Sequence, residues 1–131
     1  ADRVVVVGGG DPLGLQRLVR ALDLLDEHTR APRTVVVTRV RPGPVGPEPG
    51  RRITEALHRF AGAEAVQLVP EDRDALDVAM LHGRTLREVR PGSPARQAVQ
   101  RLAALVTGED APGSGGRTGP RRWFAPWSRQ R

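Results

Sequence analysis

Apolar residues come in short unbroken runs, separated by longer stretches in which they recur every three or four positions. Three runs rich in valine predict strands: Val4–Val7, Thr34–Thr38 and Ala65–Val69. A run without polar alternation is typical of a strand buried on both faces, as in a parallel sheet covered by helices. We therefore expect Val4–Val7 and Thr34–Thr38 to be buried strands.

The stretches with helical spacing predict four amphipathic helices. Asp11 and Pro12 are suited to cap and open the first, Gly62 and Gly83 to end the second and third, and Ser93-Pro94 to open the fourth before Gly108. The apolar stripes are Leu15, Leu18, Val19, Leu22 and Leu25; Ile53, Ala56, Leu57, Phe60 and Ala61; the segment Glu71–Leu81; and Val99, Leu102, Ala103 and Val106. A loop is expected over 42–50, where proline and glycine dominate.

Strands that alternate with helices imply parallel pairing through right-handed crossovers, which predicts an α/β fold, a three-layer sandwich with a parallel sheet. Three parallel strands make a small sheet, and the chain opens at a strand without an initiating Met. Val4–Val7 has the character of a strand with two neighbours, although the chain encodes one. We expect a fragment or half-domain whose partner strands lie upstream.

The first strand runs into a glycine-rich turn, Gly8-Gly9-Gly10-Asp11-Pro12-Leu13-Gly14, with the layout of a phosphate-binding loop. A P-loop would need Lys and then Ser or Thr after its second glycine, but Leu15 and Gln16 follow Gly14, and the chain contains no lysine. The dinucleotide fingerprint fails because Leu13 stands where a glycine is required. We therefore expect a tight turn in which glycine tolerates unusual dihedrals, and no phosphate contact.

Net charge and amino-acid composition narrow the possible classes of protein further. Residues 117–131 hold five arginines and no acid, which accounts for +5 of the net +6 and leaves +1 for residues 1–116. A nearly neutral body argues against a nucleic-acid-binding module.

The absence of cysteine fits a cytoplasmic protein, and no apolar run is long enough to span a membrane. The three histidines lie on separate predicted helices without metal-ligand spacing. No residue is predicted to be catalytic.

The predicted organisation has three parts: an α/β region over 1–108, a Gly/Ser/Pro-rich linker over 109–120 and a basic tail over 121–131. The tail contains both tryptophans and one of the two phenylalanines. Its candidate binding residues are Arg121, Arg122, Trp123, Phe124, Trp127 and Arg129. Tryptophan beside arginine suits an anionic membrane surface, single-stranded nucleic acid is a rival partner, and a solvated end without a partner is the third reading.

The succession "VVVVGGGDPLGLQRLVRALDLL", "RTVVVTRVRPGPVG" and "ALHRFAGAEAVQLVPEDRDALDVAMLHGRTLREVRPGSPARQAVQRLAAL" resembles the C-terminal half of MinD/ParA-type ATPases, above all their CpaE-like, pilus-assembly and septum-site-determining relatives. The resemblance covers residues 3–107. It implies a partial P-loop NTPase fold of the SIMIBI, MinD-like kind that lacks its N-terminal half, where the family carries its Walker A lysines and magnesium ligands.

The resemblance also implies an adenine pocket at the ends of the second and third strands. Thr38-Arg39 stands where relatives have Asn-Arg, and Val69-Pro70-Glu71-Asp72 matches the turn whose backbone lines the base. Thr38, Arg39, Pro70, Glu71 and Asp72 are thus candidate cofactor-binding residues. Thr38 offers one hydroxyl in place of a bidentate amide. The alternatives are that Thr38 satisfies local backbone and that Pro70 only ends a strand.

Two functional hypotheses follow. In the first, the chain is the C-terminal portion of an ATPase, not catalytic alone, and its full-length parent binds ATP and Mg²⁺, forms a homodimer and acts at the inner face of the plasma membrane. Its partner is then the missing N-terminal half of the ATPase domain. In the second, the chain is a non-catalytic adaptor that binds a membrane or a partner protein through its tail.

Overall fold

The computed structural model describes residues 2–108. Its elements in chain order are β1 (Val4–Gly9), α1 (Pro12–His28), β2 (Arg33–Val40), α2 (Pro49–Ala61), β3 (Val66–Pro70), α3 (Arg73–His82), α4 (Leu86–Val89) and α5 (Pro94–Thr107). The three predicted strands and four predicted helices are present. The short helix α4 was not predicted. The linker and tail predicted for 109–131 lie outside the described residues.

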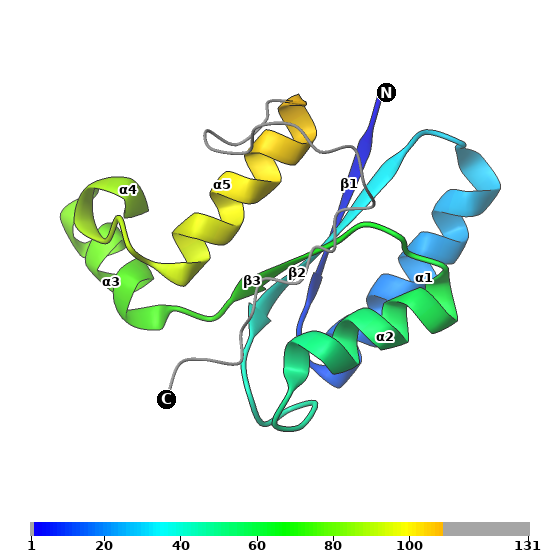
Figure 1. Cartoon of the computed structure of the whole chain (residues 1–131), viewed down its shortest axis with the longest axis horizontal. Coiled ribbons are helices and arrows are strands. Elements are labelled where there is room, and N and C mark those ends of the chain that lie inside the picture. The colour runs from blue at the N-terminus through cyan, green and yellow to red at the C-terminus, as the bar shows by residue number, and fades with distance from the viewer. Residues whose placement is uncertain (1, 109–131) are drawn as a thin grey trace, which may run out of the picture.

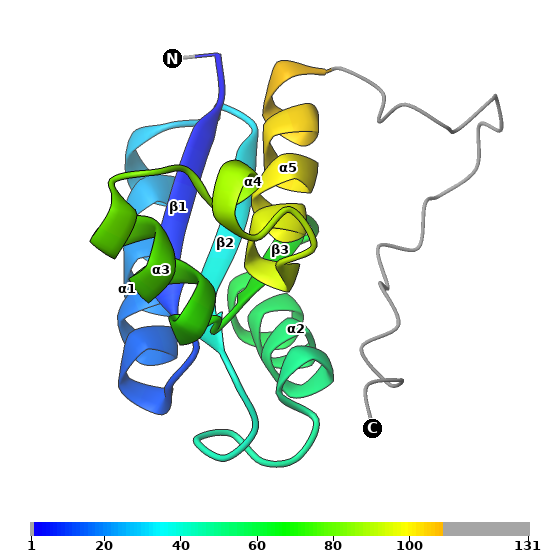
Figure 2. The same cartoon turned by 90° about the vertical axis from the view of Figure 1, so that its left-hand side faces the viewer.

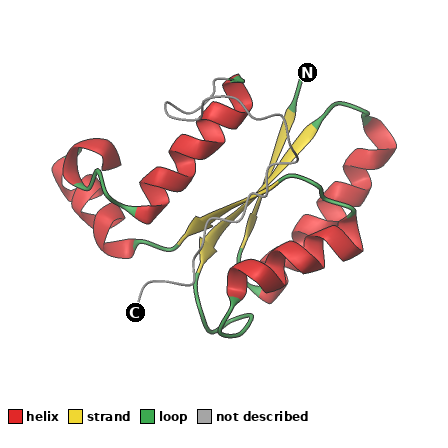
Figure 3. Ribbon diagram, in the orientation of Figure 1, coloured by secondary structure: helices red, strands yellow, loops and turns green. Residues whose placement is uncertain are grey.

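The strands form a parallel sheet in the order β1-β2-β3, so each strand lies beside the next one along the chain. In Figure 1, α1 and α2 cover one face of the sheet, and α3, α4 and α5 lie on the other side. The strands in Figure 3 accordingly run between two layers of helices. The three-layer α/β architecture is confirmed.

The main core lies between the sheet and the α1–α2 layer. Leu18 and Leu22 of α1 pack with Ile53 and Leu57 of α2 against the β2 valines. The buried members of this cluster are Leu18, Leu22, Val35, Val37, Val40, Ile53, Leu57 and Ala63. The helical stripes predicted for α1 and α2 therefore supply the core, apart from Phe60, whose exposed fraction is 66%.

The second face of the sheet is only partly covered. Helix α5 packs against β3, and its fully covered positions are the small residues Ala95 and Ala98. Figure 2 shows α5 in front of β3 and to one side of β1. Val5 and Val7 of β1 are 39% and 60% exposed as a result. The expectation that β1 is buried on both faces is wrong for this chain, because no described helix lies over its second face.

The helix ends follow the predicted capping chemistry. The Asp11 carboxylate accepts a 2.8 Å hydrogen bond from the Gly14 amide, and Pro12 opens α1. Gly62 and Gly83 end α2 and α3 in the left-handed conformation, with φ of 58° and 59°. These caps fix where each helix meets the adjoining loop.

Candidate functional site

The candidate site lies at the carboxyl ends of the three strands, which the parallel sheet brings to one edge. Gly9 of β1 is paired with Thr38 of β2, and Val40 of β2 with Pro70 of β3. The glycine turn after β1, Thr38-Arg39 near the end of β2 and Pro70–Asp72 after β3 therefore lie in a row. In doubly wound folds this edge is where ligands bind.

Close packing explains the glycine turn. A Cβ on Gly14 would lie 2.7 Å from the carbonyl oxygen of Gly9, and a Cβ on Gly8 would lie 2.9 Å from a methyl carbon of Leu18. None of Gly8, Gly9, Gly10 and Gly14 has a positive φ. The prediction of a tight turn is confirmed, but the predicted unusual dihedrals are wrong. Gly8 and Gly14 are needed where α1 packs against the turn, because a side chain would not fit at either position.

Thr38 ties β2 to the end of β1. Its hydroxyl donates a 3.2 Å hydrogen bond to the carbonyl oxygen of Gly8, and its own carbonyl accepts a 2.8 Å bond from the Gly10 amide. The hydroxyl thus satisfies local backbone, as one of the two readings of this residue expects. Its oxygen can still accept a hydrogen bond from a ligand.

Among the residues at the carboxyl ends of the strands, Arg39 has the least usual backbone conformation. It is the one non-glycine residue with positive φ among residues 2–108, at 55°, and it lies where the β2–β3 register shifts between Val37 and Val40. Left-handed backbone is disfavoured for a residue with a Cβ, and irregularities of this kind are enriched next to binding sites. The irregular backbone directs the exposed guanidinium back over β1, where a Cβ on Gly9 would lie 2.9 Å from its Nη2.

A cleft of about 490 Å³ opens beside this arginine, between the end of β1 and the start of α1. It is lined by Val7, Gly8, Gly9, Asp11, Leu13, Gly14, Arg17, Leu18, Ala21 and Arg39. Arg17 and Arg39 form no ion pair within residues 2–108, whereas Asp11 caps α1. Arg17 lies on the polar side of α1, and no local sequence pattern connects it with this edge of the sheet.

The three residues after β3 are largely engaged by the fold. Pro70 is buried, and the Glu71 amide donates a 3.0 Å hydrogen bond to the Val40 carbonyl. The Glu71 carboxylate forms ion pairs of 3.3 Å with both Arg41 and Arg73. This turn is therefore anchored to the end of β2.

Asp72 has two structural roles at the start of α3. Its carboxylate accepts a 3.3 Å hydrogen bond from the Ala75 amide, which caps the helix, and a 2.6 Å bond from the Ser93 hydroxyl. Ser93 is buried, and the sequence showed it only as a helix cap. The structure thus brings all five predicted site residues to one edge, and the side chains of Glu71 and Asp72 are held by neighbours.

Two further properties concern residues 2–108. Over this range, no group of three or more His, Asp or Glu side chains is arranged as metal ligands would be. None of its helices combines the length and the apolar character needed to cross a membrane. The predicted tail residues, Arg121 to Arg129, lie outside the described part of the chain.

Comparison with known proteins places the fold. No protein-family model and no curated protein matches the sequence. Among solved structures, MinD cell division protein of Aquifex aeolicus superposes with a TM-score of 0.65 at 22% identity, over 86% of this chain and 46% of that one. A ParA family ATPase of Chlorobium tepidum TLS gives a TM-score of 0.62 at 19% identity, over 78% of this chain and 40% of that one.

A third structure, the MinC:MinD cell division protein complex of Aquifex aeolicus, gives a TM-score of 0.58 at 19% identity, over 88% of this chain and 46% of that one. The fold is thus that of part of a MinD/ParA-like P-loop NTPase. This chain spans less than half the length of each of these solved chains.

Proposed function

We propose that this chain supplies the base-binding edge of a MinD/ParA-like, CpaE-like ATPase whose phosphate-binding half lies in an upstream stretch of polypeptide. The assembled protein would bind ATP with Mg²⁺, dimerise, and act at the inner membrane face in septum-site determination or pilus assembly. The chain itself would not be catalytic.

The observation that carries the proposal is the left-handed Arg39 at the carboxyl edge, next to Thr38 and in the same row as Pro70–Asp72. The fold does not require an arginine at this backbone position, because a glycine would adopt it without strain. A strained residue whose guanidinium has no ion pair within residues 2–108 is a reasonable candidate for ligand contact.

The phosphate and magnesium side of an ATP site does not fit the described residues. The glycine turn is filled by its own helix, since Gly14 lies against the Gly9 carbonyl, and Asp11 occupies the amide of Gly14. The chain has no lysine to contact β- or γ-phosphates. We therefore assign the base side alone to this chain, and the phosphates and Mg²⁺ to the upstream half.

The open side of β1 supports an upstream partner. Within residues 2–108, β1 pairs only with β2, and Val5 and Val7 are exposed on its second face. A further strand beside β1 with a helix above it would cover both surfaces. Burying these two valines would stabilise the assembled protein by about 25 cal/mol for each Å² of apolar surface removed from water.

The proposal is tested by calorimetric titration of ATP with Mg²⁺ into this chain and into the same chain extended upstream in its native reading frame. We expect binding only by the extended protein. In that protein Arg39→Gly should weaken binding, Thr38→Asn should strengthen it up to about tenfold through a second hydrogen bond, and the exposed Arg87→Ala on α4 should leave it unchanged. Tight binding by the short chain, or none by the extended one, would contradict the proposal.

A further inference from the structure

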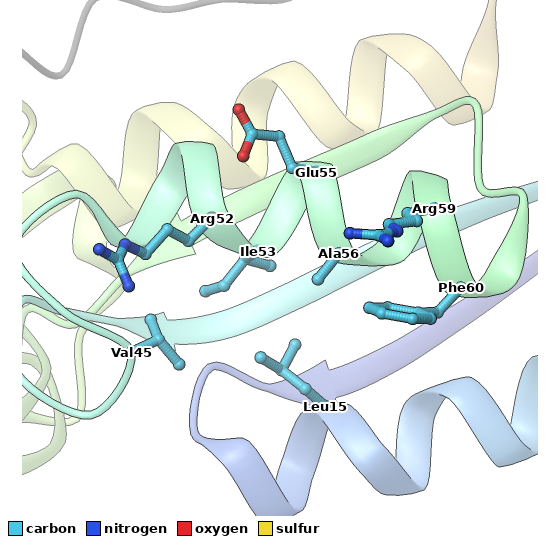
Figure 4. A pocket seen from close by; sticks show the side chains of 8 residues that line it. All are labelled: Leu15, Val45, Arg52, Ile53, Glu55, Ala56, Arg59 and Phe60. Carbon is cyan, nitrogen blue, oxygen red and sulfur yellow. The ribbon is translucent and has the colours of Figure 1, made fainter.

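A second hollow lies between the start of α1 and α2, and it shares no lining residue with the cleft beside Arg39. Its volume is about 370 Å³. Figure 4 shows its floor, where Leu15 and Val45 face Ile53 and Ala56, with Phe60 closing one end. The lining is therefore apolar in the middle and comes from two helices and the loop before α2.

Phe60 is the most conspicuous member of this cleft. Its exposed fraction is 66%, although it is one of only two phenylalanines in the chain. The Arg59 guanidinium carbon lies 5.4 Å from the centroid of its ring. An exposed aromatic ring beside an apolar hollow, steadied by a cation, is typical of the anchor residues that dominate protein interfaces.

Two arginines flank the apolar floor. Arg52 and Arg59 line opposite ends of the cleft in Figure 4, and neither forms an ion pair within residues 2–108. Arg52 lies against Gly46, whose φ is +99° and where a Cβ would lie 3.2 Å from the guanidinium carbon. The loop therefore leaves room for this guanidinium beside the cleft.

The one acid of the cleft does not neutralise these arginines. Figure 4 shows Glu55 pointing away from the other lining side chains. It pairs at 3.4 Å with Arg51, which also pairs at 2.8 Å with Glu48, and these carboxylates raise the pKa of Arg51. The rim of the cleft is thus positively charged.

The spacing of the rim charges limits what can fit. Arg52 and Arg59 are seven residues apart on one helix, which corresponds to a rise of about 10 Å. Acids two turns apart on a second helix have the same separation, and residues three or four positions after the first acid then face the apolar floor. A partner helix laid along the cleft would match both the charges and the apolar centre.

We propose that the α1–α2 cleft docks an acidic amphipathic helix of a protein partner, with acids at positions i and i+7 on Arg52 and Arg59, apolar residues at i+3 and i+4 over the half-buried Leu15 and Ala56, and Phe60 packing at one end (Figure 4). Helix-in-groove docking of this kind draws its affinity from the apolar anchors and its choice of partner from the charges. The inference does not depend on the nucleotide site.

The test uses the full 131-residue chain and fluorescein-labelled helical peptides of about 20 residues, long enough to be helical in an alanine-rich host. One peptide carries Glu at i and i+7 with Leu at i+3 and i+4, and matched peptides carry Gln, or Lys, at i and i+7. Fluorescence anisotropy at low salt gives the affinities. We expect the Glu peptide to bind most tightly and the Lys peptide least.

Variants then locate the site. The double variant Arg52→Glu/Arg59→Glu should lower the affinity for the Glu peptide and raise the affinity for the Lys peptide, each about tenfold. Phe60→Ala should lower the affinity for the Glu peptide about tenfold or more. Arg101→Glu on α5 is the matched control and should change nothing. Circular dichroism confirms that each variant is folded.

Three results would overturn the inference. The first is equal affinity of the unaltered chain for the Glu and Lys peptides. The second is undiminished binding of the Glu peptide to the Arg52→Glu/Arg59→Glu variant, which would assign the attraction to arginines elsewhere, such as those of residues 117–131. The third is the absence of any binding at millimolar peptide.

Discussion

The hydroxyl of Ser93 donates a 2.6 Å hydrogen bond to the carboxylate of Asp72, and each of these residues caps a different helix. Ser93 caps α5 through the Arg96 amide, and Asp72 caps α3 through the Ala75 amide. One bond between side chains therefore fixes the starts of two helices to each other, at the last residue of the candidate base-binding turn.

Ser93→Ala should lower the free energy of unfolding by about 2 kcal/mol, because it removes a helix cap and leaves one Asp72 oxygen without its partner in a partly buried place. Urea denaturation measures the change. The double variant Ser93→Ala/Asp72→Ala should lose less free energy of unfolding than the sum of the losses in the two single variants, because the two residues share one bond. Thr85→Ala, an exposed cap on α4, is the control, and an equal loss there would contradict the special role of Ser93.

Gly14→Ala should destabilise the protein by about 1–3 kcal/mol, since the new Cβ would lie 2.7 Å from the backbone oxygen of Gly9 and backbone cannot move aside as a side chain can. Gly92→Ala is the matched control, because no atom lies within 4 Å of its new Cβ and its φ is not positive. Thermal unfolding compares the two. If Gly14→Ala were neutral, the glycine run would need another explanation than close packing.

The start of α4 should respond to acid. The Thr85 amide and then the Thr85 hydroxyl, each 2.8 Å from the Glu88 carboxylate, hold the pKa of Glu88 below its ordinary 4.5, and Arg84 adds to this. Because the folded pKa is lowered, the interaction contributes stability above pH 4.5, and this contribution is lost as the pH falls through the folded pKa.

The Thr85 amide resonance should therefore titrate below pH 4.5. Nuclear magnetic resonance measures it. Glu88→Gln keeps the cap acceptor and should remove the titration. A midpoint at or above 4.5 would show that the capping box is not formed in solution.

Both tryptophans belong to residues 121–131, and the chain has no tyrosine, so fluorescence excited at about 295 nm reports this segment alone. We expect a blue shift with vesicles containing anionic lipid, none with neutral vesicles, and reversal by salt, because arginines near an anionic surface add up to about 1 kcal/mol each. Trp123→Phe/Trp127→Phe removes the signal and serves as the blank. A spectral change with single-stranded DNA alone would identify nucleic acid as the partner.

The sequence was sufficient to predict the order and type of the longer elements. Their signals are local: valine runs for strands, stripes such as Leu18–Leu22 for helices, and Gly62, Gly83 and Asp11 for their ends. Helix α4 was missed because four residues carry no periodicity, although Thr85 and Glu88 have the spacing of a capping box.

Burial was harder to predict, because it depends on which elements lie over which. Val4–Val7 has the composition of a fully buried strand, yet Val5 and Val7 are exposed where α5 does not reach. Phe60 continues the apolar stripe of α2, yet it lies at one end of the cleft between α1 and α2 (Figure 4) and is 66% exposed.

The site depends in the same way on contacts between segments. Sequence likeness indicated Thr38, Arg39 and Pro70–Asp72, but the left-handed Arg39 and the bond of Asp72 to Ser93 arise from the register of β2 with β3 and from the return of the chain at α5. No local pattern contains that information.

The order β1-β2-β3 has a consequence for how the protein forms. Each strand pairs with the next one along the chain, but paired residues such as Val4 and Arg33 lie 29 positions apart, so the sheet forms only as each crossover helix brings its two strands together. The outer edge of β1 takes no part in that process within residues 2–108. A strand that joins this edge afterwards meets a rigid template already in place, and it can pair there without undoing any bond of the sheet.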